Sequence, residues 1–274
     1  MKSLVLLVLV LLTSCLKPQK EIAMENVQVQ LIRNATLKIT YAGKTFLVDP
    51  VLGKKHSFMS FVEPDKNLNP TVDLPVSIAD ITKDVDALLI THVHPDHFDT
   101  KAMEVLDKNI PVYSQVFDSK AAQDAGFKTV IPVNEKVELD GIQIIRTGGQ
   151  HGPEETLEML GKVSGFVLKK ENYPTLYIVG DCIWTEEIEQ TIKASQPDVI
   201  ITNSGGAVFM GQSRILMDEH ETAKVAQTAP EATVIAVHME ALDHCATTRD
   251  KVTAVASENN LNILVPANGE VINL

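Results

Sequence analysis

Three histidines and an aspartate within six positions constrain this chain more than any other feature of its sequence. They lie in THVHPDH, residues 91–97, directly after Ala87–Ile90, four apolar residues that predict a buried strand. His92 and His94 are two positions apart on the end of an extended segment, so their side chains point the same way and can converge on one ion. Asp96 and His97 follow the proline, where a helix can begin, and can turn back toward a second ion. The pattern therefore predicts a metal site at the end of a buried strand.

The segments around this motif predict one α/β domain, residues 26–274, in which two sheets are covered by outer helices. Apolar–polar alternation predicts antiparallel strands at 27–32, 36–41 and 45–48. From residue 85 onward, strands at 87–90, 112–113, 137–139, 142–146, 163–168, 176–179, 199–202, 233–237 and 261–265 alternate with helices at 100–106, 119–125, 186–194, 218–228 and 248–258. Residues 52–75 are rich in Pro, Asn, Lys and Asp and show no regular pattern. They predict a lid or binding loop, or else plain surface structure.

The HxHxDH pattern after a buried strand resembles the metal-binding signature of the metallo-β-lactamase superfamily. The resemblance covers nearly the whole chain after its N-terminal segment. It implies the fold of that family, a four-layer αββα sandwich of two mixed β-sheets flanked by helices. It also implies further ligands at strand ends, for which the chain offers His151, Asp181 and His238. Asp49 ends an early strand, where the family places an aspartate that supports the ligands from behind.

By this resemblance His92, His94 and His151 would hold one ion. Asp96, His97 and His238 would hold a second ion, and Asp181 would bridge the two. Histidine nitrogen and carboxylate oxygen also accept manganese or iron, so zinc is only the default for the two divalent ions. Bound ions lower the pKa of water from about 15.7 toward 7 and provide hydroxide at neutral pH. Asp96 would orient that nucleophile as a catalytic residue. The implied activity is hydrolysis of an ester, lactone, amide or phosphodiester.

The segment after residue 237 resembles a branch of ascorbate-6-phosphate-lactonase-like proteins, as does GQHG at residues 149–152. Glu240, His244 and Arg249 lie near the expected metal site in sequence and are candidate substrate-pocket residues. Surface or packing roles are the alternative for all three. His56 and His220 are expected on the surface.

Other functions of the family fit the residues less well. One class of zinc β-lactamases carries a cysteine where Asp181 stands here, and Cys182 would face the opposite side, which disfavours antibiotic hydrolysis. Flavodiiron relatives carry glutamate at the position of His94, so a redox protein is a weak third possibility. A non-catalytic metal-binding envelope lipoprotein is the main alternative to an enzyme. The complete ligand set favours the enzyme, because storage and structural sites are normally closed to water.

The net charge limits which classes of molecule the protein can bind, and the cysteine content bears on whether it forms a disulfide. The formal net charge of −12, without a cluster of Lys and Arg, excludes nucleic acid as an expected partner. A small-molecule or lipid-derived substrate is expected instead. Cys182 and Cys245 could pair in an oxidising compartment or remain free thiols.

The N-terminus predicts export. Lys2 precedes an apolar run at residues 4–12, which is too short for a membrane span of about twenty residues. LTSC at residues 12–15 resembles the lipobox of bacterial lipoproteins, with an ordinary secretory signal as the alternative. The prediction is a signal peptide at 1–14, a lipid on Cys15 and a tether at 15–25. The lipid would hold the protein in the cell envelope, on the outer face of the inner membrane or in the outer membrane on the periplasmic side.

Overall fold

The computed structural model describes residues 27–274. The predicted signal peptide, the lipid on Cys15 and the tether lie outside these described residues. Within the described part, no helix is both long enough and apolar enough to cross a membrane.

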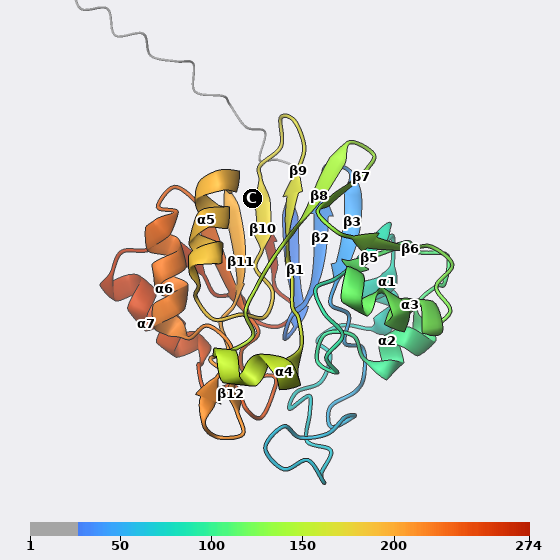
Figure 1. The fold of residues 1–274 in the computed structure, drawn as a ribbon, viewed down its shortest axis with the longest axis horizontal. Coiled ribbons are helices and arrows are strands. Elements are labelled where there is room, and N and C mark those ends of the chain that lie inside the picture. The colour runs from blue at the N-terminus through green and yellow to red at the C-terminus, as the bar shows by residue number, and fades with distance from the viewer. Residues whose placement is uncertain (1–26) are drawn as a thin grey trace, which may run out of the picture.

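Two seven-stranded sheets face each other (Figure 1). The first has the order β16 (Val271–Asn273), β1 (Gln28–Arg33), β2 (Thr36–Tyr41), β3 (Lys44–Val48), β4 (Ala87–Ile90), β5 (Val112–Gln115) and β6 (Val130–Val133). The second has the order β15 (Ile263–Leu264), β14 (Thr233–Val237), β11 (Val199–Asn203), β10 (Leu176–Ile178), β9 (Gly165–Lys169), β8 (Ile142–Thr147) and β7 (Lys136–Leu139). A separate hairpin joins β12 (Val208–Phe209) and β13 (Ser213–Arg214).

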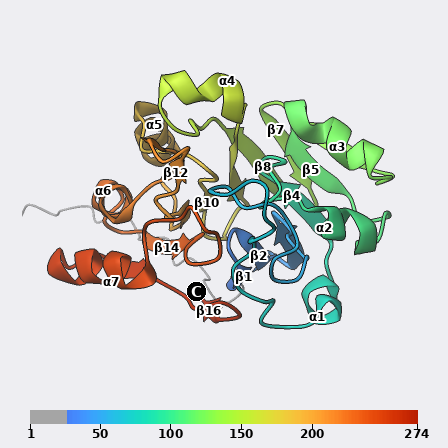
Figure 2. The same ribbon diagram turned by 90° about the horizontal axis from the view of Figure 1, so that it is seen from below.

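Helices cover the outer face of each sheet (Figure 2). Those on the first sheet are α1 (Ile78–Thr82), α2 (Thr100–Val105) and α3 (Ser119–Asp124), and they share an apolar cluster with β3 and β4. Those on the second sheet are α5 (Glu186–Ser195), α6 (Glu219–Thr228) and α7 (Arg249–Glu258). A short helix, α4 (Leu157–Leu160), lies at the end of the sheets that also carries the β12–β13 hairpin. The predicted αββα sandwich of two mixed sheets is confirmed.

The main core lies between the two sheets. Alternate residues of β2, such as Leu37 and Ile39, point into it, opposite Phe166 and Ile201 of the second sheet. β4 is buried on both faces, because Ala87 and Leu89 enter this core while Leu88 and Ile90 pack under the helices. A strand covered on both faces is apolar throughout, which explains the unbroken run before the histidine motif.

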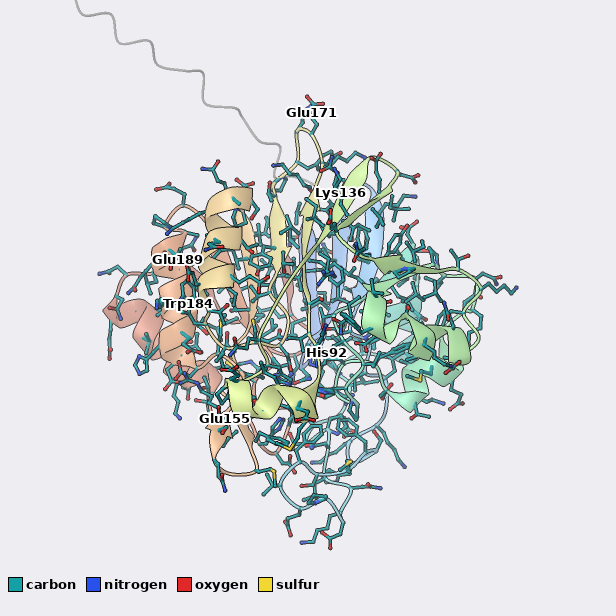
Figure 3. The ribbon with its side chains drawn as sticks, viewed as in Figure 1. His92, Lys136, Glu155, Glu171, Trp184 and Glu189 are labelled. Carbon is teal, nitrogen blue, oxygen red and sulfur yellow. The ribbon has the colours of Figure 1, made fainter. Side chains whose placement is uncertain are left out.

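The parallel strands bring their carboxyl ends to one edge of the sandwich. β3 runs parallel to β4, and β10, β11 and β14 run parallel to one another. The residues that follow these strands therefore meet at the same edge, where ligands usually bind in α/β sheets. His92 lies at this edge, whereas Glu171, in the turn after β9, lies at the opposite one (Figure 3).

Several elements differ from the prediction. β6, β12, β13, β16, α1 and α4 were not predicted, and the strand expected at 261–265 is only Ile263–Leu264. Asp218 was predicted within a helix, but it precedes α6 and its carboxylate accepts hydrogen bonds from two backbone N–H groups of the first turn. Residues 52–75 form a long loop, as predicted, with a β-bridge between Phe58 and Asn69.

Candidate metal centre

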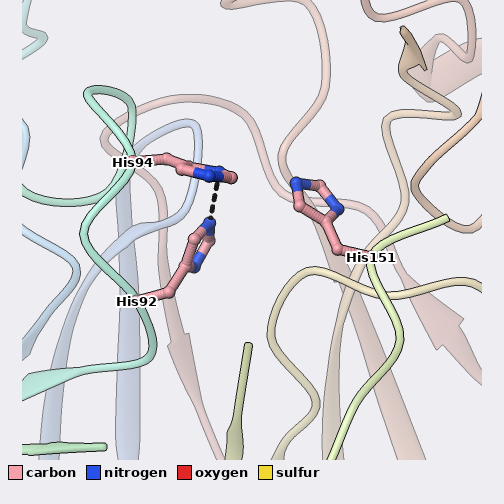
Figure 4. Close-up of side chains that lie close together, drawn as sticks. All are labelled: His92, His94 and His151. Carbon is pink, nitrogen blue, oxygen red and sulfur yellow. Dashed lines mark hydrogen bonds between the residues drawn. The ribbon is translucent and has the colours of Figure 1, made fainter. Parts of the chain in front are cut away.

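Three histidines from two segments form the first group. His92 and His94 follow β4, His151 follows β8, and each offers a ring nitrogen within 4.8 Å of the others (Figure 4). Nε2 of His92 lies 3.0 Å from Nδ1 of His94. His92 and His151 are buried, and His94 is partly exposed on the open side. Three nitrogens at this spacing can hold one divalent ion.

Asp96, His97, Asp181 and His238 form the second group, with ligand atoms within 4.8 Å of one another and all four residues buried. Oδ2 of Asp181 lies 3.1 Å from Nε2 of His97, 3.7 Å from Nε2 of His151 and 3.9 Å from Nε2 of His92. Its Oδ1 lies 3.6 Å from Nε2 of His238. Asp181 therefore stands between the two groups, in the place expected of a bridging ligand.

Local backbone geometry presents these side chains. The carbonyl of His94 accepts hydrogen bonds from the N–H groups of His97 and Phe98, which turns the chain back immediately after the motif. His238 adopts a positive φ of 65°, so the chain bends sharply at the end of β14. Both turns place candidate ligands at strand ends, where the histidine motif and the resemblance to the superfamily predicted them.

Hydrogen bonds behind the ligands fix the orientation of their rings and carboxylates. Nδ1 of His151 donates to the carbonyl of Ile215 at 3.0 Å, which leaves Nε2 facing the centre. The amide of Asn203 donates to Oδ1 of Asp181 at 2.6 Å. Such outer contacts set ring orientation and ligand basicity in metal sites. Sequence reasoning missed Asn203, although a polar residue at the end of a predicted strand was an available signal.

Asn34 is a second residue that sequence reasoning missed. It lies in the β1–β2 turn, and its amide donates to the carbonyl of Asp96 at 3.0 Å. Nothing in the local sequence indicated this contact, because 62 positions separate the two residues.

The electrostatics of the centre favour positive charge. Burial lowers the pKa of His151 to about 4, so its ring is neutral at pH 7 and its lone pair is available. Burial would also lower the pKa of His97, but Asp181, Asp96 and Asp49 together raise it to about 10. The pKa of His238 is likewise raised, against the effect of burial, mainly by Asp181 and Asp96. Buried carboxylates that hold protons on neighbouring imidazoles mark a site for a cation, so the residues fit the predicted ions.

A cavity of about 340 Å³ opens beside the two groups. Its wall includes His94, Asp96, His151 and Asp181, together with apolar side chains and His244. The apolar part comes from the long loop, α4 and the β12–β13 hairpin, through Met59, Phe61, Pro64, Leu160, Val208, Phe209, Met210 and Ile215. The volume is within the range of small-molecule pockets.

The structure separates the three predicted pocket residues. His244 lies in the wall of the cavity, with its ring 4.6 Å from that of Phe61. Glu240 and Arg249 do not line it, so their prediction as pocket residues is wrong. They form an ion pair with each other, and Arg249 also donates to the carbonyl of Pro266. This pair holds the start of α7 and leaves neither side chain for a substrate.

Two further histidines and two cysteines considered in the sequence analysis lie outside the candidate metal centre. His56 and His220 are exposed, in agreement with the prediction. Cys182 is buried in the apolar cluster under α5, and both Cys182 and Cys245 are free thiols.

Comparisons with known proteins agree with this geometry. Residues 44–239 match the family model described as the beta-lactamase superfamily domain. The chain belongs to the metallo-β-lactamase superfamily. It is also 39% identical over 245 residues to the UPF0173 protein YddR of Bacillus subtilis (strain 168), across 87% of this chain and 96% of that protein.

Solved structures place the chain among metal-dependent hydrolases of this superfamily. A possible metal-dependent hydrolase from Veillonella parvula DSM 2008 superimposes with a TM-score of 0.87 at 35% identity, covering 91% of this chain and 100% of that one. An isothiocyanate hydrolase from Delia radicum gut bacteria gives a TM-score of 0.85 at 33% identity, covering 90% and 99%. The chain is accordingly a metal-dependent hydrolase of the UPF0173 family, which disfavours the non-catalytic alternative.

Proposed function

We propose that this hydrolase cleaves a small, uncharged, largely apolar molecule at an electrophilic carbon. The observation that carries the proposal is the wall of the cavity beside the ligands. It contains eight apolar side chains besides Pro95 and the histidines and aspartates, and no Lys or Arg is among its lining residues. A phosphorylated lactone with its carbonyl carbon at the ions would place its phosphate against this wall, where no Lys or Arg is available to pair with it.

The proposal includes two divalent ions, with zinc as the default. His92, His94 and His151 would hold the first, Asp96, His97 and His238 would hold the second, and Asp181 would contribute to both. When bound, the ions lower the pKa of water and polarise the substrate. Oδ2 of Asp96 lies 3.3 Å from Nε2 of His238, and Asp96 is one of the residues of the cavity wall. Its carboxylate could therefore accept a hydrogen bond from the attacking water and orient it.

The proposed substrates are esters, lactones, amides and isothiocyanates. Isothiocyanates are included because the Delia radicum bacterial enzyme, 33% identical to this chain, is described as an isothiocyanate hydrolase. The resemblance of the C-terminal segment to ascorbate-6-phosphate-lactonase-like proteins supports attack at a carbonyl carbon. The apolar wall favours a substrate without the phosphate.

We also propose that a lipid on Cys15 retains the enzyme in the cell envelope, on the evidence of residues 2–15. β1 and β3 both pair antiparallel with β2, so Gln28 begins β1 at the edge of the sheet opposite to the ligands. Attachment at that end would leave the mouth of the cavity unobstructed.

The decisive experiment measures metal content and turnover together. The purified chain would be assayed against neutral short-chain esters, lactones, amides and isothiocyanates, and against a phosphodiester, with and without chelator. Two ions per chain and chelator-sensitive hydrolysis of a neutral substrate are expected. Asp181→Ala serves as the inactive control. Preferred hydrolysis of the phosphodiester would overturn the proposed substrate class.

A further inference from the structure

A second cavity, of about 660 Å³, adjoins the one beside the ligands. The two cavities share five wall residues: Phe61, Pro64, Val208, Met210 and His244. Both lie between the long loop after β3 and the β12–β13 hairpin, which approach each other at the site edge of the molecule (Figure 2). A molecule that reaches past Phe61 and Met210 would therefore enter the second cavity from the first.

The lining of the second cavity suits hydrocarbon. Val62, Gly211 and Ala246 belong to this cavity and not to the first. Val62 is 63% exposed and Met210 is 70% exposed, so large apolar side chains face solvent at its rim. Exposed apolar surface grouped in this way marks a binding groove.

The one carboxylate in this wall already has partners. Asp243 accepts hydrogen bonds from the hydroxyl of Ser60, the N–H of Phe61 and the amide of Asn69. These bonds keep the pKa of Asp243 low, against the effect of burial, and occupy both of its oxygens. Asp243 therefore serves as a structural residue and offers little to a polar ligand.

The same bonds fix the wall in place. They join the loop around Ser60 to the segment after β14, and the amide of Asn69 also donates to the carbonyl of Met59. The ring of His244 packs edge-on against that of Phe61. The second cavity is thus a preformed surface, which lowers the cost of ordering it when a ligand binds.

We propose that the second cavity binds the apolar tail of the substrate whose reactive carbon lies at the metal centre. This inference rests on the proposed function and narrows it to elongated amphiphilic molecules with a hydrocarbon tail. Each buried methylene should then strengthen binding by about threefold, somewhat less than full burial would give. The gain should stop where the tail leaves the cavity.

The test measures binding directly, so that it does not depend on turnover. Linear 1-alkanols of about four to about ten carbons would be titrated calorimetrically into the metal-loaded protein. Ala246→Trp would fill the second cavity from a position outside the first and outside the ligand set. Ala254→Trp, on an exposed position of α7 that lines neither cavity, is the matched control.

The expected result is a dissociation constant that falls by about threefold per methylene in the unsubstituted protein and in Ala254→Trp. In Ala246→Trp the fall should end at a shorter chain, with the affinity for the shortest alcohol unchanged. Equal chain-length dependence in all three proteins, or no dependence at all, would overturn the tail site. Turnover of a short neutral ester or isothiocyanate by the same samples tests the proposed function separately.

Discussion

Nδ1 of His97 donates a 2.8 Å hydrogen bond to Oδ2 of Asp49, the same oxygen that accepts a 2.6 Å hydrogen bond from the hydroxyl of Thr91. The other oxygen of Asp49 accepts from the N–H of Thr91 at 2.8 Å. Asp49 therefore fixes the proton of His97 on Nδ1 and directs Nε2 toward Asp181. It also joins the ends of β3 and β4, which position the histidine motif.

Asp49→Ala should weaken metal binding in the group that contains His97. Loss of such an outer partner typically costs about 10- to 100-fold in metal affinity, because the ring loses its fixed orientation. Competition with a chelator of known affinity would measure the change. Asp65→Ala, which removes an exposed aspartate, should leave the affinity unaltered. Equal metal affinities in Asp49→Ala and Asp65→Ala would show that Asp49 does not support metal binding by orienting His97.

Asp181→Ala and His94→Ala should abolish hydrolysis without unfolding the protein. Asp181 contacts both ligand groups, and His94 belongs to the more open one, so each substitution should lower kcat/KM by more than the roughly 100-fold attributed to outer partners. Turnover assays combined with circular dichroism would separate activity from folding. His220→Ala, at an exposed histidine, is the control. A folded, fully active Asp181→Ala variant would contradict the assignment.

Metal loading should release protons at pH 7. The pKa of His97 is raised to about 10 and that of His238 is also raised, so the metal-free protein holds an additional proton on each ring at neutral pH. Ions must displace these protons, and the apparent metal affinity should therefore increase with pH up to about 10. Calorimetric titrations in buffers of different ionisation enthalpy would count the protons. An affinity independent of pH between 6 and 9 would contradict the prediction.

Arg33 should prove important for stability although it lies outside the metal centre. Its guanidinium is fully buried, and it donates to the carbonyls of Val51, Gly53 and Val72, which hold both ends of the long loop. Arg33→Ala would leave these carbonyls without that donor and should lower the free energy of unfolding by about 3 kcal/mol or more. Chemical denaturation would measure it. Arg214→Ala, which removes exposed ion pairs, should cost less than about 1 kcal/mol.

Local pattern indicated His92, His94, Asp96 and His97 as candidate ligands, and the resemblance to the superfamily added the other three. His92 and His94 follow a strand whose apolar run is visible in the sequence, and His151, Asp181 and His238 each follow another predicted strand. Backbone periodicity indicates where a strand ends and on which side its next residues lie. The roles of His151, Asp181 and His238 were implied by the resemblance to the superfamily, and the structure brings these residues to the same edge. The strand and helix pattern predicted two sheets with outer helices, and the resemblance to the superfamily implied the αββα fold.

Proximity along the chain misled the prediction for Glu240 and Arg249. Positive φ angles of 65° at His238 and 58° at Glu240 turn the chain sharply after β14. Glu240 consequently meets Arg249 at the start of α7, while His244, further along, returns to the cavity. Sequence distance carries no information on such a reversal, because the direction of the chain depends on the backbone angles that packing imposes.

The sequence by itself determined which residue types are available to the candidate metal centre and that they follow strands, because residue type and strand-end placement are local properties. Only the tertiary structure decided what surrounds it. β16 pairs Val271 with Gln30 and Asn273 with Gln28, two segments that are more than 200 positions apart. A strand of three residues is too short to be predicted from its sequence pattern. The cavity walls likewise come from the long loop, α4 and the hairpin, which are far apart in sequence. Such contacts arise when whole helices, strands and loops pack together, whereas a sequence pattern predicts only the local conformation of the residues that form it.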